Sequence, residues 1–169
     1  MAKAGIQKKI KGGDQKVGSD KPLRKGLSEY HRVFRFIGIS NPGPDSFNEI
    51  EYINHIRSGF SYAIIANLAD QMEFSDDDFS SIFHISKRTM SRRKPEDSLN
   101  AEQTERAIEL ARLYVRGEEV FGEMNLFKEW MNRNLRALGN KKPKEFLDTS
   151  IGIHFIMDEL GRIEHGVFA

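Results

Sequence analysis

The sequence contains no cysteine, so a disulfide framework and a thiolate metal site are both excluded. It also lacks an apolar run long enough to span a membrane, and its N-terminus has no apolar core of the kind found in signal peptides. A chain without cysteine is suited to a reducing compartment. We therefore expect a soluble cytoplasmic protein with no membrane partner.

An excess of charge of one sign is also missing, because the net charge is only +1. The distribution is uneven: residues 1–32 carry nine Lys and Arg against three Asp and Glu, residues 33–94 seven against eight, and residues 95–169 ten against fourteen. Total charge therefore predicts no class of partner. Its distribution predicts a basic tail, a near-neutral middle with one concentrated basic cluster, and an acidic C-terminal part.

Signatures of catalysis are scarce as well. The sequence has neither a G-x-S-x-G nucleophile motif nor a Walker phosphate loop. The histidines are scattered, and no carboxylate completes a convincing metal site with any of them: His31, His55, His84, His154 and His165. We therefore expect a protein that is not an enzyme, has no catalytic residues, and binds neither a cofactor nor a metal.

Residues 1–28 form a segment rich in Lys and Gly and poor in large apolar side chains. Such a segment cannot bury enough surface to offset its ordering entropy, so we predict a disordered basic tail. Two roles are open for it. It can be a solubilising tail that orders only in an assembly, or an arm that supplements nucleic-acid binding.

Beyond the tail, apolar residues recur at spacings of three and four, which predicts an all-α protein. The stretch 29–39 reads as a short strand or a short helix, and Asn41 to Pro44 then break the chain. The next helix, capped by Asp45 or Ser46 and stopped by Gly59, has an apolar stripe of Phe47, Ile50, Ile53 (or Tyr52) and Ile56. Further helices are predicted at 61–72, at 76–83 with Ser75 as its cap, at 87–93 with Ser86 as its cap, and at 101–117 or beyond. The stretch 119–134 continues as helix with a break near Gly122, one or two turns begin at Pro143, and a last helix covers 150–164.

A basic cluster stands out in the sequence HISKRTMSRRK, from His84 to Lys94. The helix over 76–83, the turn and the helix over 87–93 are typical of a helix-turn-helix, in which the second helix enters the major groove of DNA. Ile82, Phe83, Ile85 and Met90 can close a small core beneath it. The candidate DNA-binding residues are Ser86, Lys87, Arg88, Thr89, Ser91, Arg92, Arg93 and Lys94.

Two observations weigh against that reading. A basic run at a helix C-terminus also complements the helix dipole. Moreover, Asp76, Asp77 and Asp78 fill the first turn of a helix that commonly lies near the DNA backbone in this motif, where carboxylates repel phosphate.

The second half of the chain, residues 126–169, resembles the C-terminal domain of the Xre/MbcA/ParS-type antitoxins. The matching features are Trp130, Asn134, Ala137-Leu138-Gly139, Pro143 with Phe146-Leu147, Gly152, Leu160-Gly161-Arg162-Ile163 and His165-Gly166-Val167. The stretch 79–93 resembles the Xre-like helix-turn-helix half of that family, so that the likeness covers about 59–169. Asn140 stands where the family often has Gly, and Met131 where it usually has Leu. The resemblance implies an Xre-like helix-turn-helix domain at 29–100 and a small helical toxin-binding domain at 101–169.

The resemblance also implies a function. Such bacterial antitoxins pair with RES-domain toxins, which consume NAD⁺, and form homodimers within a hetero-oligomeric complex. The C-terminal helix and tail occlude the toxin's active site, and the complex binds operator DNA and represses its own operon. The matching toxin-binding residues would be Arg162, Glu164, His165, Gly166, Val167, Phe168 and Ala169. The alternative is that Arg162 is a surface residue and that Val167 and Phe168 fold back on the core.

Two other functions remain open at this point. A stand-alone helix-turn-helix repressor would use its C-terminal domain only to dimerise. A pure toxin-sequestering protein without a DNA role is favoured by the three consecutive aspartates.

Overall fold

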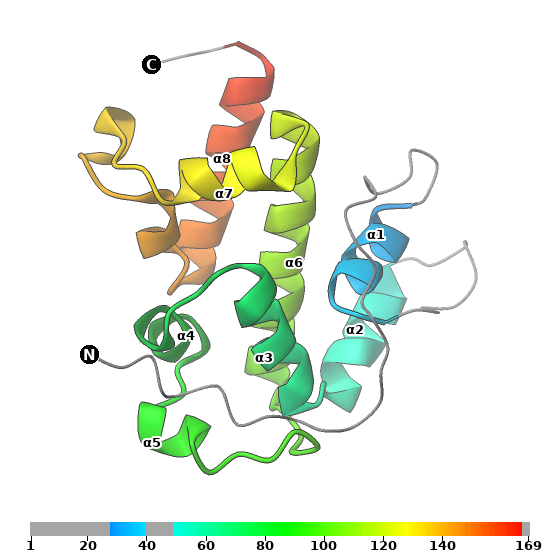
Figure 1. Ribbon diagram of the computed structural model, residues 1–169. Coiled ribbons are helices and arrows are strands. Elements are labelled where there is room, and N and C mark those ends of the chain that lie inside the picture. Colours follow the sequence, from blue (N-terminus) through cyan, green and yellow to red (C-terminus); the bar gives the residue numbers. More distant parts are fainter. Residues whose placement is uncertain (1–27, 40–48, 167–169) are drawn as a thin grey trace.

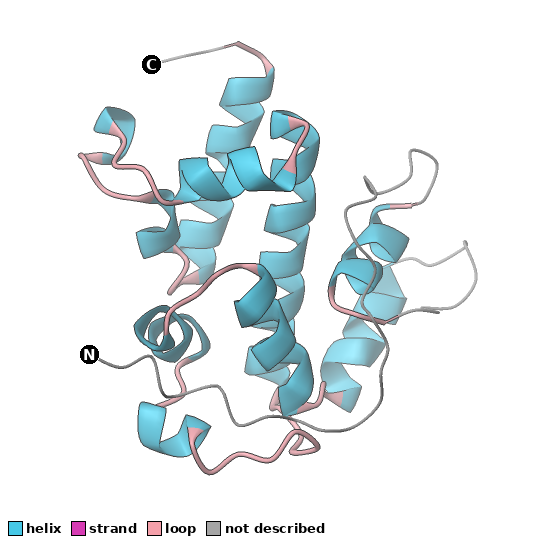
Figure 2. Ribbon diagram, viewed as in Figure 1, coloured by secondary structure: helices cyan, strands magenta, loops and turns pink. Residues whose placement is uncertain are grey.

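The computed structural model describes residues 28–39 and 49–166, and the part of the chain it describes is helical (Figures 1 and 2). Two isolated bridges are the only strand-like pairings in those ranges. No helix within them is long and apolar enough to cross a membrane. The predicted basic tail lies outside the described residues, apart from Ser28, as do the proposed caps Asp45 and Ser46.

The N-terminal half contains five helices among the described residues: α1 (Glu29–Phe36), α2 (Glu49–Ser58), α3 (Tyr62–Gln71), α4 (Asp76–Phe83) and α5 (Lys87–Met90). The segment 29–39, for which strand and helix were both open, is thus a helix. Gly59 ends α2 with a φ of +75°, a conformation that L side chains rarely adopt.

The caps of α4 and α5 follow the sequence prediction. The Ser75 hydroxyl accepts a hydrogen bond from the Asp78 N–H, and the Asp78 carboxylate accepts one from the Ser75 N–H, which is a complete capping box. His84 ends α4 in the left-handed region, with φ +52°. Ser86 then caps α5 by accepting from the Thr89 N–H.

Helix α5 is shorter than predicted, because it ends at Met90 and not near Arg93. The reason lies downstream, where the chain must return to α3. The Tyr62 and Ala63 N–H groups donate to the carbonyl oxygens of Asp97 (2.7 Å) and Pro95 (2.9 Å). These bonds satisfy the free donors at the start of α3, which has no side-chain cap, and they draw the chain away from the α5 axis.

The apolar stripe predicted on α2 is wrong at Ile50, and of the two alternatives Ile53 and Tyr52 it is Tyr52 that packs inward. The side chains of Ile50 and Ile53 are 61% and 43% exposed. Tyr52, the alternative to Ile53, and Ile56 are the residues that pack against the core. Phe47 lies outside the described residues.

Helix α6 (Ala101–Phe121) is the spine of the molecule, with α1, α2 and α3 packed on it from the N-terminal half and α7 and α8 from the C-terminal half (Figure 1). Tyr114, 1% exposed, lies where these groups meet. Its ring centroid lies 6.1 Å from that of Phe36, 6.2 Å from that of Phe74 and 5.1 Å from that of Phe127. One hydrophobic core therefore runs through both halves.

The C-terminal half consists of α7 (Met124–Met131), two 3₁₀ helices, η1 (Arg136–Leu138) and η2 (Pro143–Phe146), and α8 (Ser150–Glu164). The predicted break is confirmed, since Gly122 ends α6 with φ +79°. Asn140 has φ +62°, so it accepts the left-handed conformation expected where the family often has Gly. Met131 is buried, as a replacement for Leu should be.

Candidate functional site

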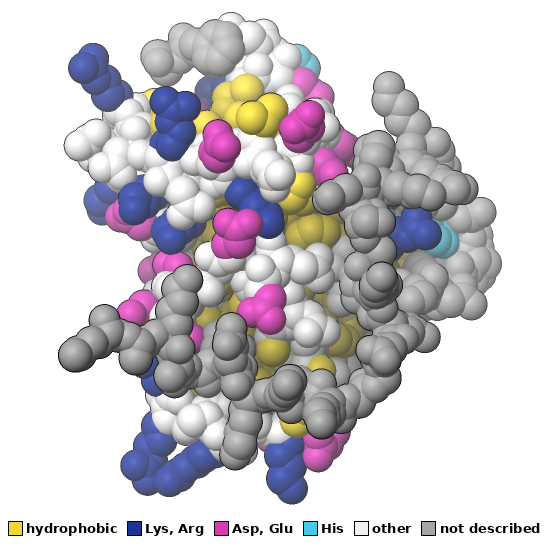
Figure 3. All heavy atoms as spheres, in the orientation of Figure 1, with side chains coloured by type: hydrophobic (Ala, Val, Ile, Leu, Met, Phe, Trp, Pro, Cys, Tyr) yellow, Lys and Arg dark blue, Asp and Glu magenta, His cyan; other side chains and the backbone are white. Residues whose placement is uncertain are grey.

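The predicted DNA-binding residues form an exposed surface at one end of the molecule. Figure 3 shows Lys and Arg side chains gathered at the lower left, over α5. The core below it is the predicted one, since Ile82, Phe83 and Ile85 are buried and Met90 is half-buried. Helix α5 itself buries no residue completely. Its side chains are therefore available to a partner.

Within this surface the cations differ in their surroundings. Lys87 Nζ lies 2.6 Å from the Asp77 carboxylate, a contact that raises the pKa of Lys87. Arg93 is half-buried and lies 4.0 Å from the Asp97 carboxylate. Arg88, Arg92 and Lys94 are exposed and have no ion pair among residues 28–39 and 49–166. The Ser86 hydroxyl caps α5 by accepting from the Thr89 N–H, and it also shares a hydrogen bond with the Thr89 hydroxyl (2.9 Å).

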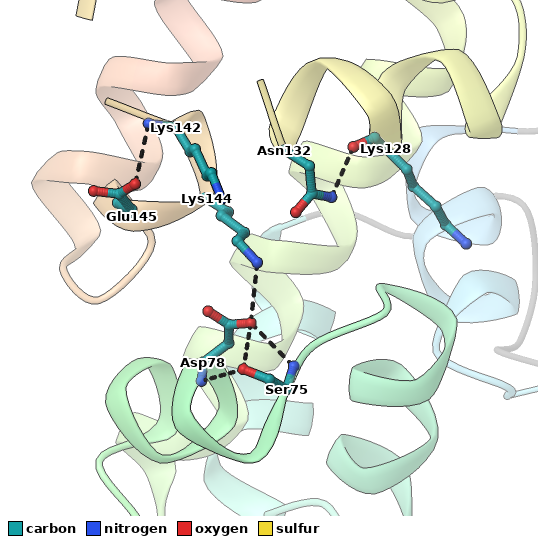
Figure 4. Close-up of polar contacts among 7 residues, drawn as sticks. All are labelled: Ser75, Asp78, Lys128, Asn132, Lys142, Lys144 and Glu145. Atoms are coloured by element: carbon teal, nitrogen blue, oxygen red, sulfur yellow. Dashed lines mark hydrogen bonds and ion pairs between the residues drawn. The ribbon is translucent and has the colours of Figure 1, made fainter. Parts of the chain in front are cut away.

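Two of the three aspartates that weighed against DNA contact have cationic partners. Asp77 faces Lys87, whereas the Asp78 carboxylate accepts from Ser75 and from Lys144 Nζ at 3.2 Å (Figure 4). Burial raises the pKa of Asp78, but the Ser75 hydrogen bonds and the Lys144 ammonium outweigh it and hold that pKa below its usual value. The negative potential that this helix terminus presents to a phosphate is thereby reduced.

The second predicted surface lies at the end of α8, at the opposite end of the molecule from α5 (Figure 1). Arg162 is exposed and pairs with Glu159 one turn earlier on the same helix. Glu164 pairs with Arg116 of α6, which anchors the last turn of α8 to the spine. His165 is exposed, and Gly166 has φ +68°. Val167, Phe168 and Ala169 lie outside the described residues.

The structure has a small cavity between α4 and α6. This cavity of about 80 Å³, lined by the end of α4 and the start of α6, has room for a few water molecules and not for an organic cofactor. Among the described residues, no group of three or more His, Asp or Glu side chains is arranged to hold a metal ion.

Sequence reasoning missed the contacts that join the two halves. Lys144 reaches Asp78 and Lys128 reaches Glu73, over sequence separations of 66 and 55 residues. The sequence predicted Ser75 as the cap of α4, but not the partner of Asp78. Nothing in the sequence marks Lys144 or Lys128 as different from the neighbouring lysines.

Comparison with known families finds matches to two domains. Residues 51–112 match the antitoxin Xre-like helix-turn-helix domain, and residues 116–166 match the antitoxin Xre/MbcA/ParS C-terminal toxin-binding domain. The first match contains α4 and α5, and the second contains α7, η2 and α8.

Whole proteins of the same kind are also similar. An Antitoxin Xre of Photorhabdus laumondii is 27% identical over 137 residues, which cover 80% of this chain and 89% of that protein. An Antitoxin Xre of Yersinia enterocolitica is 27% identical over 119 residues, covering 69% and 80%. Both domains are thus matched on this helical chain, and each contributes one of the two surfaces described above. The chain therefore belongs to the Xre/MbcA/ParS family of type II antitoxins, and a cognate toxin is its partner.

Proposed function

We propose that the cognate toxin is an NAD⁺-degrading enzyme of the RES type, and that the end of this chain blocks its active site. The observation that carries the proposal is the composition and placement of the segment from Arg162 to Ala169. It begins in the last turn of α8, which the ion pair of Glu164 with Arg116 anchors, and it carries an arginine, a histidine and several apolar side chains. A plug for a nucleotide pocket requires shape-filling groups together with a charged group.

We further propose that α5 and its flanks bind operator DNA, so that the antitoxin regulates its own synthesis. Arg88 and Arg92 are the candidates for base contacts, because both are exposed arginines without an ion pair among the described residues, and arginine reads guanine bidentately. Lys87, Arg93 and Lys94 are assigned to phosphates. Ser86, Thr89 and Ser91 complete the surface.

The assembly that follows is a homodimer within a hetero-oligomeric complex with the toxin, since operators with two half-sites require two helix-turn-helix units. The chain is not itself an enzyme in this proposal. It acts in the bacterial cytoplasm, where both its toxin and its operator are found.

Two truncations test the plug. The first ends at Gly166 and removes only Val167 to Ala169, which leaves the contact of Glu164 with Arg116 in place. The second ends at Gly161 and removes that contact as well. Each is co-expressed with the cognate toxin, and toxin capture and cellular NAD⁺ are measured. We expect full-length chain to hold the toxin and preserve NAD⁺, and the chain ending at Gly161 to fail in both.

The shorter deletion assigns the effect to residues. Loss of NAD⁺ protection with toxin capture retained would place the active-site block in Val167 to Ala169. Full protection by both truncated chains would rule out a plug. Capture of a toxin that leaves NAD⁺ intact when expressed alone would rule out the RES-type partner.

DNA binding is tested separately with Arg88→Ala and Arg92→Ala in titrations of the operator. Each substitution should cost about 1–3 kcal/mol if the side chain contacts a base. Lys94→Ala should weaken all sequences alike and reduce the salt dependence. Unchanged affinity in the double arginine variant would favour a protein that sequesters its toxin without a DNA role.

A further inference from the structure

The two proposed binding surfaces lie at opposite ends of the molecule, and a small group of polar contacts joins the halves between them (Figures 1 and 4). Lys144 Nζ of η2 lies 3.2 Å from the Asp78 carboxylate at the start of α4. Lys128 Nζ of α7 lies 2.9 Å from the carboxylate of Glu73, in the connection between α3 and α4. We call Glu73, Ser75, Asp78, Lys128 and Lys144 the polar seam.

A single oxygen atom is central to this seam. Oδ2 of Asp78 accepts hydrogen bonds from the Ser75 N–H (3.0 Å), the Ser75 hydroxyl (2.7 Å) and Lys144 Nζ (3.2 Å) (Figure 4). One atom therefore takes part both in the capping box of α4 and in the attachment of α4 to η2. The side chains of Asp78 and Lys144 are only 23% and 21% exposed, so solvent screens this contact less than it screens a surface pair.

The contacts continue from the seam to the proposed DNA surface. Asp77, next to Asp78 in the first turn of α4, lies 2.6 Å from Lys87 at the start of α5. Helix α5 buries no residue completely, so its position depends on its Ser86 cap, on half-buried Met90 and on the short turn from α4, in which Ile85 is buried. A change in how η2 holds α4 thus reaches α5 through adjacent residues.

We infer that the polar seam couples the toxin-binding half of this antitoxin to its helix-turn-helix. A toxin that shifts η2 or α7 changes how α4 and α5 are held. By thermodynamic reciprocity, DNA bound on α5 changes the affinity for the toxin by the same factor. The inference rests on the proposed function only for the identity of the ligand at the α5 end.

Lys144→Gln is the variant that isolates the seam. Asp78 also caps α4, so replacing it would damage the helix itself, whereas the contact of Lys144 with Asp78 can be removed without touching the capping box. Lys142→Gln is the matched control. It removes the same charge two residues away, and the contact that Lys142 makes in Figure 4 comes from its backbone N–H to Glu145 (3.3 Å).

Amide hydrogen exchange over residues 75–91 measures the coupling without DNA. Full-length chains are compared alone and at toxin concentrations that saturate each variant. We expect toxin binding to change exchange in α4 and α5 severalfold in the unmodified chain and in Lys142→Gln, and the change to vanish in Lys144→Gln. An equal response in all three chains, or none in the unmodified chain, would overturn the inference.

Operator titrations with and without saturating toxin give the coupling as a ratio of dissociation constants. Allosteric couplings commonly amount to factors of about 5–150, and we expect the ratio to move toward one in Lys144→Gln alone. A ratio unchanged in that variant contradicts the inference. If the unmodified chain binds no operator, the DNA part of the proposed function is wrong, and the exchange experiment still decides the coupling.

Discussion

At the residue scale, two glycines of α8 have opposite surroundings. A methyl group on Gly152 would overlap the backbone carbonyl of Phe146, whereas nothing lies within 4 Å of the corresponding position on Gly161. Gly152 therefore permits the close approach of η2 to the start of α8. Gly161 serves no packing purpose among the described residues.

We predict that Gly152→Ala lowers the free energy of unfolding by about 1–3 kcal/mol, the usual cost of overpacking. Gly161→Ala is the matched control and should raise it by about 0.5–1 kcal/mol, because alanine loses less backbone entropy in a helix. Urea unfolding followed by circular dichroism measures both. Equal effects of the two substitutions would mean that η2 does not hold its position against α8.

Tyr52 of α2 is a second residue with an unusual environment. Its hydroxyl is buried and has no hydrogen-bond partner among residues 28–39 and 49–166. Burial, followed by the carboxylate of Glu29, raises the pKa of Tyr52 to about 12. A phenol with a raised pKa in the folded state ionises more easily in the unfolded state. The free energy of unfolding therefore falls as pH rises from about 10 to about 12.

Tyr52→Phe should accordingly leave stability at pH 7 unchanged or higher, since an unpaired buried hydroxyl is removed. Between pH 10 and 12 its stability should fall less steeply than that of the unmodified chain. Burial, followed by the carboxylate of Glu51, also raises the pKa of Tyr30 to about 12. Tyr30 therefore accounts for part of the pH dependence that remains in the variant. Urea midpoints at several pH values provide the measurement, and identical slopes for the two chains would contradict it.

At the scale of elements, the charge that α5 presents to a partner depends on an exposed ion pair. Asp77 lies against Lys87 and competes with a phosphate for it. We predict that Asp77→Asn tightens operator binding severalfold and steepens its dependence on salt, because one more cation becomes free to release counterions from DNA. Asp70→Asn, which removes the same charge from the exposed surface of α3, is the control. Equal gains in operator affinity in both variants would mean that net charge alone causes the effect.

The elements were largely predictable from local signals. Ser75 with Asp78, Ser86, Gly122 and Pro143 mark helix ends by their own chemistry, and the structure has helix ends at each of them. The end of α5 was not predictable. It depends on hydrogen bonds between the chain near Asp97 and the start of α3, which only the folded arrangement supplies.

Part of the candidate site was also predictable from local signals, and part was not. Exposed arginines on a short helix follow from periodicity, and the structure does expose Arg88 and Arg92. The partner of Asp78 did not follow, because an ion pair over 66 residues depends on how whole helices pack. Similarly, Ile50 and Ile53 continue the spacing of a buried stripe but point away from the core.

At the scale of the whole molecule, α6 makes the two halves one cooperative unit. Tyr114 contacts aromatic rings of α1, of the connection between α3 and α4, and of α7. The predicted division of the chain at residue 100 would separate the first half from α6, against which α1, α2 and α3 pack. The boundary at residue 100 therefore stays a prediction about function, and the two parts on either side of it are not expected to fold independently.

We predict a single unfolding transition for the full chain. Trp130, the only tryptophan, reports on the C-terminal half by fluorescence, and far-ultraviolet circular dichroism reports on all helices. Because both halves share α6, the two urea transitions should coincide. Tyr114→Ala should move both midpoints together, with a loss of about 3–5 kcal/mol. Separate transitions would show that the halves unfold independently.

The shared spine has a consequence for the lifetime of the protein in the cell. A protease that pulls on either end of the chain meets one cooperative unit, so it cannot trim away one half and release the other intact. Under the proposed function, repression of the operon and inhibition of the toxin would then be lost at the same rate. A cell that degrades this antitoxin would lift both restraints in the same event, without a period in which a surviving fragment occupies the operator while the toxin runs free.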